Sequence, residues 1–308
     1  MSGSPHRGSS TLRGINTSRP NPARVYDWYL GGGHHWAIDR YFGRHALEIW
    51  PAANTVAQHQ RGWVSRVVRT ALKSGIAQFL DLGSGFSTPG GVQDVIATQR
   101  RHPSARVVAV DWEPLVVAHV RTRLEQTQAS DWSGIAEADL RDPAQVLAHP
   151  ETARLLDLSR PVCVLLGSVL HYVPGTATVP ALLAEYRSHL VPGSWIALSH
   201  LTAEHATSSG QAAFQRFCAT YETTLGRPLK PRTRHEIGTW LSADTLLAPG
   251  LVAVPDWRPD TTITAQDAAT ARPYAWCAVI RVTKPNASRN GPNRPGSQHG
   301  VSEGGNTG

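Results

Sequence analysis

The chain has 308 residues, a formal net charge of +7 and three cysteines. This length can bury a full core, and it suits one large domain or two small ones at about 100–200 residues each. No apolar run approaches the ~18–20 residues of a membrane-spanning helix, and Cys163, Cys218 and Cys277 are too widely spaced for a disulfide framework or a zinc knuckle. We therefore expect a cytoplasmic protein with no membrane partner and with reduced, buried thiols.

The excess charge lies mostly in the two ends of the chain. Residues 1–20 carry three arginines and no acid, and residues 284–308 carry three basic residues and one acid. Both segments are rich in Gly, Ser, Asn and Pro and hold almost no large apolar side chain, so burial cannot offset their ordering entropy. We predict two disordered basic tails, and the small charge left between them does not favour nucleic acid as a partner.

Between the tails, apolar patterns predict alternating helices and strands. From Asn54 to Leu72 apolar residues recur at every third or fourth position, which indicates an amphipathic helix that Gly75 ends. This alternation predicts a parallel sheet with helices on both faces. Strands are expected at Ala77–Leu82, Arg106–Val110, Gly134–Ala138, Val162–Leu166 and Ser194–Ser199, with helices at 90–101, 114–128, 144–156 and 179–190.

The pattern changes beyond the last of these strands. A helix is expected at Gly210–Leu225, followed by a polar, basic stretch at Arg227–Glu236 and a short helix capped by Ser242. Strands at Leu251–Val254 and Trp276–Val282 are separated by a turn-rich stretch. They can pair as an antiparallel hairpin at the edge of the sheet.

The turn after the first strand is the most informative segment. The apolar strand meets Asp81 and then Gly83, Ser84 and Gly85. Glycine accepts backbone angles and close ligand approach that a Cβ would block. Because open α/β folds bind ligands at the carboxyl edge of the parallel strands, this turn is a candidate binding site.

Two further acids, Asp111 and Asp139, end the next two strands. A dinucleotide fingerprint would need a third glycine where Thr88 stands, and Asp81 before the turn would repel a pyrophosphate. Carboxylates instead suit an ammonium or sulfonium group and a ribose, whose two hydroxyls can donate to Asp111. Asp139 can accept from an adenine amino group, and Trp112 offers an aromatic wall. Helix caps and turn acids are the alternative, but three acids at successive strand ends favour a nucleoside site.

In their order along the chain these residues, together with Leu165–Tyr172, resemble the motifs of class I S-adenosylmethionine-dependent methyltransferases. More narrowly, the chain is similar to an actinobacterial S-adenosylmethionine-dependent methyltransferase family that was long a domain of unknown function. The distinctive parts of this likeness are Ala23–Gly32, Phe79–Pro89 and Gly250–Pro259.

The resemblance implies a Rossmann-like α/β fold with a seven-stranded, mostly parallel sheet, an antiparallel last strand and helices on both faces. It implies a helical lid at residues 21–75, whose segment 26–32 folds over S-adenosylmethionine, and a cofactor-binding methyltransferase domain at residues 76–283. Members usually carry Lys-Asp-Asn where this chain has Gly33-His34-His35, and Asn-Arg where it has Gln60-Arg61. The planar fork of Arg61 can grip the cofactor's carboxylate, and a solvated helix arginine is the alternative. The cofactor-binding residues that the resemblance implies are Tyr26, Tyr29, Gly31, Arg61, Asp81, Gly83, Ser84, Gly85, Asp111, Trp112, Asp139, Leu140, Gly167 and Ser168.

The function that the resemblance implies is transfer of a methyl group from S-adenosylmethionine to an unidentified acceptor, by family analogy a small molecule. Such transfer needs positioning more than an acid or base. His171 is a candidate general base, and a loop histidine that only bonds the backbone is the alternative. Acceptor contacts are expected from His34–Tyr41, Tyr172–Pro174 and Thr202–Glu236. No metal site is predicted, because the histidines lack ligand spacing.

Two other functions stay open. A non-catalytic sensor or partner subunit would bind S-adenosylmethionine or S-adenosylhomocysteine without turnover. An NAD-dependent dehydrogenase would share the fold class but lacks the third glycine. The sequence also leaves open whether the chain is a monomer or a homodimer.

Overall fold

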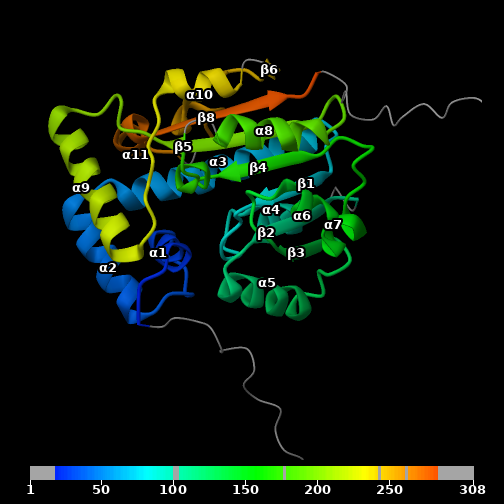
Figure 1. The fold of residues 1–308 in the computed structure, drawn as a ribbon, viewed down its shortest axis with the longest axis horizontal. Helices are drawn as coiled ribbons and strands as arrows, with labels where there is room; N and C mark the ends of the chain where they lie inside the picture. Colours follow the sequence, from blue (N-terminus) through cyan, green and yellow to red (C-terminus); the bar gives the residue numbers. More distant parts are fainter. Residues whose placement is uncertain (1–17, 100–103, 176–177, 242–243, 261–262, 284–308) are drawn as a thin grey trace, which may run out of the picture.

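A computed structural model describes residues 18–99, 104–175, 178–241, 244–260 and 263–283 (Figure 1). The two predicted tails therefore lie outside the described residues, apart from 18–20. The described chain forms one mixed sheet in the order β3-β2-β1-β4-β5-β8-β6, with β7 paired to β8. The strands are β1 (Gln78–Leu82), β2 (Arg106–Asp111), β3 (Ser133–Glu137), β4 (Cys163–Gly167), β5 (Trp195–Leu201), β6 (Thr245–Leu246), β7 (Val252–Ala253) and β8 (Ala275–Arg281).

The first five strands are parallel, and their order reverses at β1. This strand pairs with β2 on one side and with β4 on the other, with Leu80 opposite both Val108 and Val164. A reversal of strand order opens a crevice at the carboxyl ends, because the connections leave β1 and β4 in opposite directions. The predicted fold class and the five predicted parallel strands are confirmed.

The antiparallel edge follows the prediction with one difference. β8 runs antiparallel to β5, and β7 pairs with β8 as the predicted hairpin. Seven strands were expected, whereas the described chain has eight, because the edge is divided between β6 and β7. Pro249 lies between these two short strands and has no N–H to donate to a ladder.

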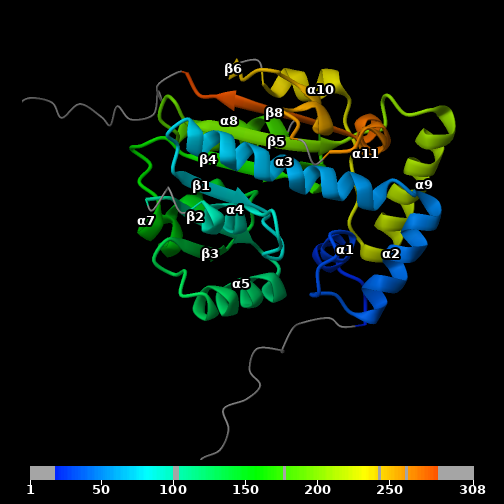
Figure 2. The same ribbon diagram turned by 180° about the vertical axis from the view of Figure 1, so that it is seen from behind.

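Helices cover both faces of the sheet. The α3, α4 and α5 helices pack on one face, and α6, α7, α8 and α10 pack on the other. Figure 1 shows α8 in front of the strands, and Figure 2, the view from behind, shows the long α3 crossing in front of them. Their bounds are α3 (Ala53–Lys73), α4 (Val92–Thr98), α5 (Pro114–Gln126), α6 (Pro143–Ala148), α7 (Pro150–Leu155), α8 (Thr178–Ser188) and α10 (Arg234–Trp240).

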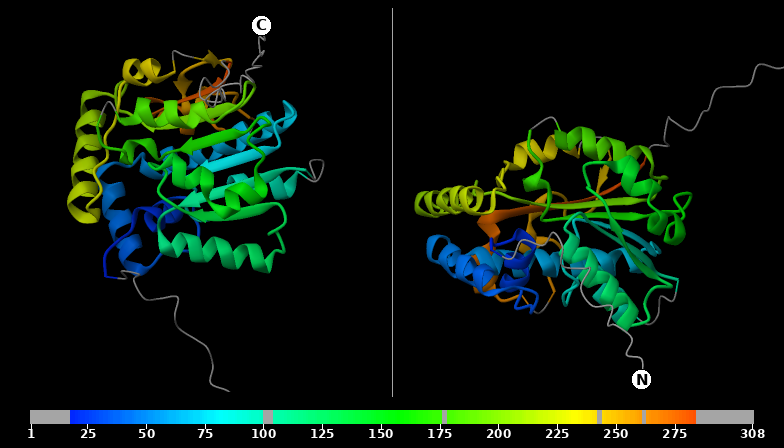
Figure 3. Two further views of the ribbon diagram at one scale, coloured as in Figure 1. Left: turned by 45° about the vertical axis from the view of Figure 1, so that its right-hand side comes forward. Right: turned by 60° about the horizontal axis from the view of Figure 1, so that its bottom comes forward.

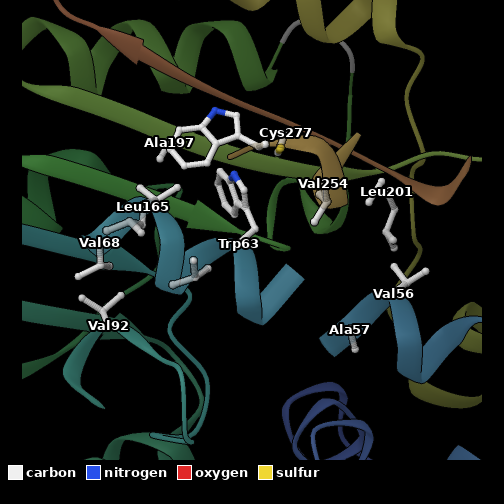
Figure 4. Close-up of a cluster of buried hydrophobic side chains, with 14 of the residues drawn as sticks. Val56, Ala57, Trp63, Val68, Val92, Leu165, Ala197, Leu201, Val254 and Cys277 are labelled. Carbon is white, nitrogen blue, oxygen red and sulfur yellow. The ribbon is translucent and has the colours of Figure 1, made fainter. Parts of the chain in front are cut away.

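The core between α3 and the sheet follows from the ~3.6-residue period of the helix and the two-residue period of the strands. On α3, Trp63 and Val68 are fully buried, and they face Leu165 and Ala197 from β4 and β5 (Figure 4). Successive strand residues point to opposite faces, so Leu80 belongs to the core on the other side. The predicted helix at 54–72 is confirmed as α3, and it is part of the sheet's own core.

Three helices form a cap at the carboxyl ends of the parallel strands: α1 (Pro22–Tyr29), α2 (Ala37–Ile49) and α9 (Ser208–Leu225) (Figures 1 and 3). The Asn21 side chain caps α1 by accepting from the backbone N–H of Ala23. A buried ion pair from Arg24 Nε to Asp39 Oδ2, 2.7 Å long, ties α1 to α2. The α1 and α2 helices of the cap are therefore joined to each other by a buried ion pair.

The short helices differ from the prediction. The helix near the basic stretch is α10, which Thr233 caps through a capping box with Glu236, rather than a later helix capped by Ser242. Ser242 itself lies outside the described residues. The stretch predicted as turns contains α11 (Ala265–Ala271), and Pro150 divides the predicted helix at 144–156 into α6 and α7.

Candidate functional site

A cavity opens at the carboxyl edge of the sheet, between the strand ends and the cap. Together with its mouth it contains about 1610 Å³ of empty space. Its lining comes from the loops after β1, β2, β3 and β4 and from α1, α3 and α9. The strand-end residues that are distant in sequence thus share one cavity.

The glycine turn forms one wall of this cavity. Gly83 and Gly85 have φ values of 68° and 63°, in the left-handed region that favours glycine. A Cβ on Gly83 would lie 2.5 Å from Cγ1 of Val169, whereas a Cβ on Gly85 would meet no atom within 4 Å. Gly85 therefore presents bare backbone to open space, as a close-fitting ligand requires.

Asp111 holds this turn in place. Its Oδ2 accepts from the Gly85 N–H at 2.9 Å, and its Oδ1 accepts from the Glu113 N–H at 3.0 Å. Burial raises the pKa of Asp111 above its ordinary value, against the opposing effect of these two donors. Each carboxylate oxygen keeps lone-pair capacity for a further donor such as a sugar hydroxyl. Trp112 beside it is 49% exposed at the mouth of the cavity.

Asp81 and Arg61 form an electrostatic pair at the inner end of the glycine turn. Burial raises the pKa of Asp81 to about 6, although the nearby Arg61 guanidinium lowers it. The Arg61 Nε is buried and has no hydrogen-bond partner among the described residues. A buried donor without a partner is costly, so this guanidinium is poised for an external acceptor such as a carboxylate.

Gln60 connects α3 to the strand ends. Its Oε1 accepts from the hydroxyl of Ser168, which follows β4, and from Ser199 Oγ at 2.8 Å. The Ser168 backbone N–H also donates to Ser199 Oγ at 3.0 Å. Sequence reasoning predicted Ser168 for cofactor binding but not Gln60, which was noted only because it stands where family members usually carry Asn.

The Asp139 carboxylate forms an ion pair with the neighbouring guanidinium of Arg141. Arg141 Nε donates to both carboxylate oxygens, at 3.0 and 2.9 Å, and this lowers the pKa of Asp139. The Arg227 guanidinium lies 4.1 Å from the centre of the Trp112 ring. Arg141 and Arg227 both line the cavity. Its mouth therefore holds one guanidinium paired with a carboxylate and another stacked on an indole ring.

His171 lies on the loop after β4 and is 3% exposed. Burial, together with the neighbouring His200 and Arg232, lowers its pKa well below 6.5, so the imidazole is neutral at pH 7. Its Nδ1 is buried without a hydrogen-bond partner among the described residues. The buried Arg232 fixes this loop by donating to backbone oxygens of Leu170 and Val173, at 3.2 and 3.0 Å.

Nearly all the residues predicted for cofactor binding line this cavity, as does His171. The exception is Gly31, whose φ of 74° and N–H bond to the Trp28 carbonyl place it in the turn that ends α1. Gly31 therefore ends a helix in this structure, and its part in cofactor binding stays a prediction.

The predicted acceptor segments differ in their position relative to the cavity. Tyr172 lines the cavity, but the segment His34–Tyr41 does not. His34 instead packs against Phe86 and His119, with ring centroids 5.3 and 3.9 Å apart. The predicted segment Thr202–Glu236 contributes Phe217 and Tyr221 to the lining, and packing of the cap brings Trp50 beside them.

The donor set fits an adenosyl amino acid better than a dinucleotide. Asp81 can balance a cation, Arg61 can take a carboxylate, and Asp111 can accept from hydroxyls next to a glycine wall. An aromatic face, Trp112, lies beside Asp111. No described helix is long and apolar enough to cross a membrane.

Comparison with known proteins agrees with this chemistry. A family model described as S-adenosyl methyltransferase matches residues 9–283. The chain is similar to a Thermobifida fusca protein described as a methyltransferase, with 31% identity, a TM-score of 0.78, and 88% of this chain and 98% of that chain covered. It is similar to a DUF574 family protein from Streptomyces avermitilis, with 30% identity, a TM-score of 0.77 and coverage of 86% and 98%. A search of the curated proteins gave no match.

Proposed function

This chain belongs to the S-adenosyl methyltransferase family, and we propose that its cavity holds S-adenosylmethionine with the amino-acid end at Asp81 and Arg61 and the ribose at Asp111. The chain is accordingly an S-adenosylmethionine-dependent methyltransferase. One observation carries the proposed placement: the half-buried Asp81, beside an Arg61 whose Nε has no partner among the described residues, and the buried Asp111 lie on either side of one glycine turn.

Each group has a distinct part in binding. The Asp81 carboxylate favours a positive charge, and the free Nε of Arg61 supplies a donor for the carboxylate of the same ligand. Asp111 accepts from the ribose hydroxyls while its own bonds keep the turn in register. At the mouth, Trp112 covers the base, and Asp139 or the neighbouring Leu140 contacts its edge.

When bound, the cofactor supplies a methyl group made electrophilic by its sulfonium sulfur, and the acceptor loses a proton as it takes that group. The chain's contribution is to hold donor and acceptor in line and to exclude water. Tyr26 lies on the cofactor side of the cavity. Burial raises its pKa, and the nearby Arg61 offsets part of this rise. Tyr172 is close to Tyr26 and continues the wall toward the deeper end.

We further propose that the acceptor is a small molecule, because the cavity is lined by the cap on one side and by strand ends on the other. A concave site of this kind suits a small ligand. The cytoplasmic location and a homodimer remain predictions from the sequence.

Calorimetric titration with S-adenosylmethionine, S-adenosylhomocysteine and NAD tests the placement. We expect micromolar affinity for both adenosyl ligands, and an Asp111→Asn variant should bind them at least tenfold more weakly, at the ~1.5–3 kcal/mol of a charge-assisted hydrogen bond. Asp131 is exposed on the loop before β3, so Asp131→Asn is the matched control and should bind normally. Preference for NAD, or equal weakening by both substitutions, would contradict the placement.

A further inference from the structure

Beyond the cofactor groups, the deeper end of the cavity is a continuous aromatic wall. The ring centroids of Trp50 and Phe217 are 4.8 Å apart, and those of Phe217 and Tyr221 are 5.3 Å apart. The series continues from Tyr221 to Tyr172 at 6.4 Å and from Tyr172 to His171 at 4.6 Å. We call these five side chains, together with Tyr29 of α1, the aromatic chamber. All six line the cavity.

The aromatic chamber carries no formal charge. The formally charged residues that line the cavity lie outside these six: Arg61 acts on Asp81, and Arg227, which stacks on Trp112, also acts on Tyr172 at the edge of the chamber. The imidazole of His171 is neutral because burial lowers its pKa. Placing an ionised group in such surroundings without a partner would be costly. The part of a ligand that enters the chamber should therefore be uncharged.

Two buried polar groups of the aromatic chamber lack partners among the described residues. They are the Tyr29 hydroxyl and the His171 Nδ1. The neighbouring hydroxyls behave differently, because Tyr172 Oη donates to Tyr221 Oη at 3.3 Å. Buried polar groups are almost always hydrogen-bonded in folded proteins. Two unpartnered groups in one apolar chamber therefore point to a ligand that bears polar atoms at its edge.

From these observations we propose that the acceptor is an uncharged, planar aromatic compound bearing hydroxyl or carbonyl oxygens. Flat rings match the offset and edge contacts that aromatic side chains favour at about 4.5–7 Å. Ring oxygens supply partners for the Tyr29 hydroxyl and for His171 Nδ1. The inference rests on the proposed function, since it treats the chamber as the acceptor end of the same cavity.

Binding to the protein saturated with S-adenosylhomocysteine tests the acceptor class. The probes are hydroxynaphthalenes and hydroxyanthraquinones, compared with saturated cyclic alcohols of the same ring number and with naphthoic acid. We expect the neutral aromatic probes to bind at least tenfold more tightly than either comparison set. Tyr29→Phe, which removes only the hydroxyl, should weaken the aromatic probes about two- to tenfold, as one hydrogen bond predicts. Tyr41 of α2 is 72% exposed, so Tyr41→Phe is the matched control and should change nothing.

The outcomes separate this inference from the proposed function. If S-adenosylhomocysteine binds but aromatic probes bind no better than the saturated alcohols, the acceptor class is wrong and the cofactor site stands. The same holds if Tyr29→Phe and Tyr41→Phe have equal effects on the affinity for the aromatic probes. If S-adenosylhomocysteine itself does not bind, the proposed function fails first, and the acceptor class fails with it.

Discussion

At the scale of single residues, the site depends on two acids, Asp81 and Asp111, whose ionisation is opposed by burial. Burial raises the pKa of Asp81 to about 6 and opposes ionisation of Asp111. Such groups are stabilised when a ligand brings the missing charge or donors. Asp139 differs, because Arg141 already holds it ionised. The sequence ranked the three acids alike, since spacing alone does not show which of them is already paired.

The raised pKa of Asp81 predicts a pH-dependent affinity for S-adenosylmethionine. The cationic ligand favours the ionised carboxylate, so its binding lowers the pKa of Asp81 and competes with protonation of the free protein. Affinity should be nearly constant above about pH 7 and fall by up to about tenfold per pH unit below about pH 6. Calorimetry between pH 5 and 8, at about half-unit steps, measures this slope.

Asp81→Asn is the matching variant, because it removes the titrating group and keeps its shape. It should bind weakly at pH 8 and lose much of the slope below pH 6. An unchanged slope in this variant would show that another group is responsible for the pH dependence.

At the scale of elements, long periodic segments could be predicted from sequence and short ones could not. The α3 helix and the strands β1, β2, β4 and β5 carry strong apolar patterns, and the structure confirms them. The α10 and α11 helices have only seven residues each, so capping and tertiary packing decide their ends. Topology likewise decides which residues of the site could be predicted from sequence. Parallel strand ends must meet at one edge, whereas Trp50 and Phe217 converge only through packing of the cap.

The loop after β4 illustrates how an element outside the site positions it. Arg232 follows α9 and is 4% exposed, and its guanidinium donates to carbonyls of that loop and to His200 Nε2 at 3.0 Å. Truncation to methionine leaves several buried carbonyls without donors. We expect Arg232→Met to lower the free energy of unfolding by about 2–4 kcal/mol, at ~1–3 kcal/mol for each unsatisfied group.

Urea denaturation measures this loss, with Arg216→Met as control because Arg216 is exposed on α9. The control should change stability by less than about 0.5 kcal/mol, as exposed substitutions usually do. Equal effects of the two substitutions would mean that Arg232 does not hold the loop.

At the scale of the whole molecule, the cap and the sheet enclose one cavity, and we expect them to respond together to a ligand. Asn21 at the start of α1 donates from its side chain to Glu113 Oε2 at 2.8 Å, which joins the cap to the loop after β2 across the mouth. Tyr26 and Tyr29 of α1 line the cavity. Binding should therefore stabilise α1 more than elements remote from the cavity.

Hydrogen exchange with and without S-adenosylhomocysteine checks this coupling in the intact chain. We expect amides of α1 to exchange at least tenfold more slowly when the ligand is bound. The α8 helix packs on the sheet and contributes no residue to the cavity lining, so it is the internal control and should change less. Protection of α8 without protection of α1 would exclude a cap that contacts the ligand.

The most direct measurement is a crystal structure of the complex with S-adenosylhomocysteine. The account predicts the ribose hydroxyls within hydrogen-bond distance of Asp111, the amino-acid end at Asp81 and Arg61, and the aromatic chamber free beyond the sulfur. A ligand bound elsewhere, or one whose ribose lies away from Asp111, would contradict the proposed site.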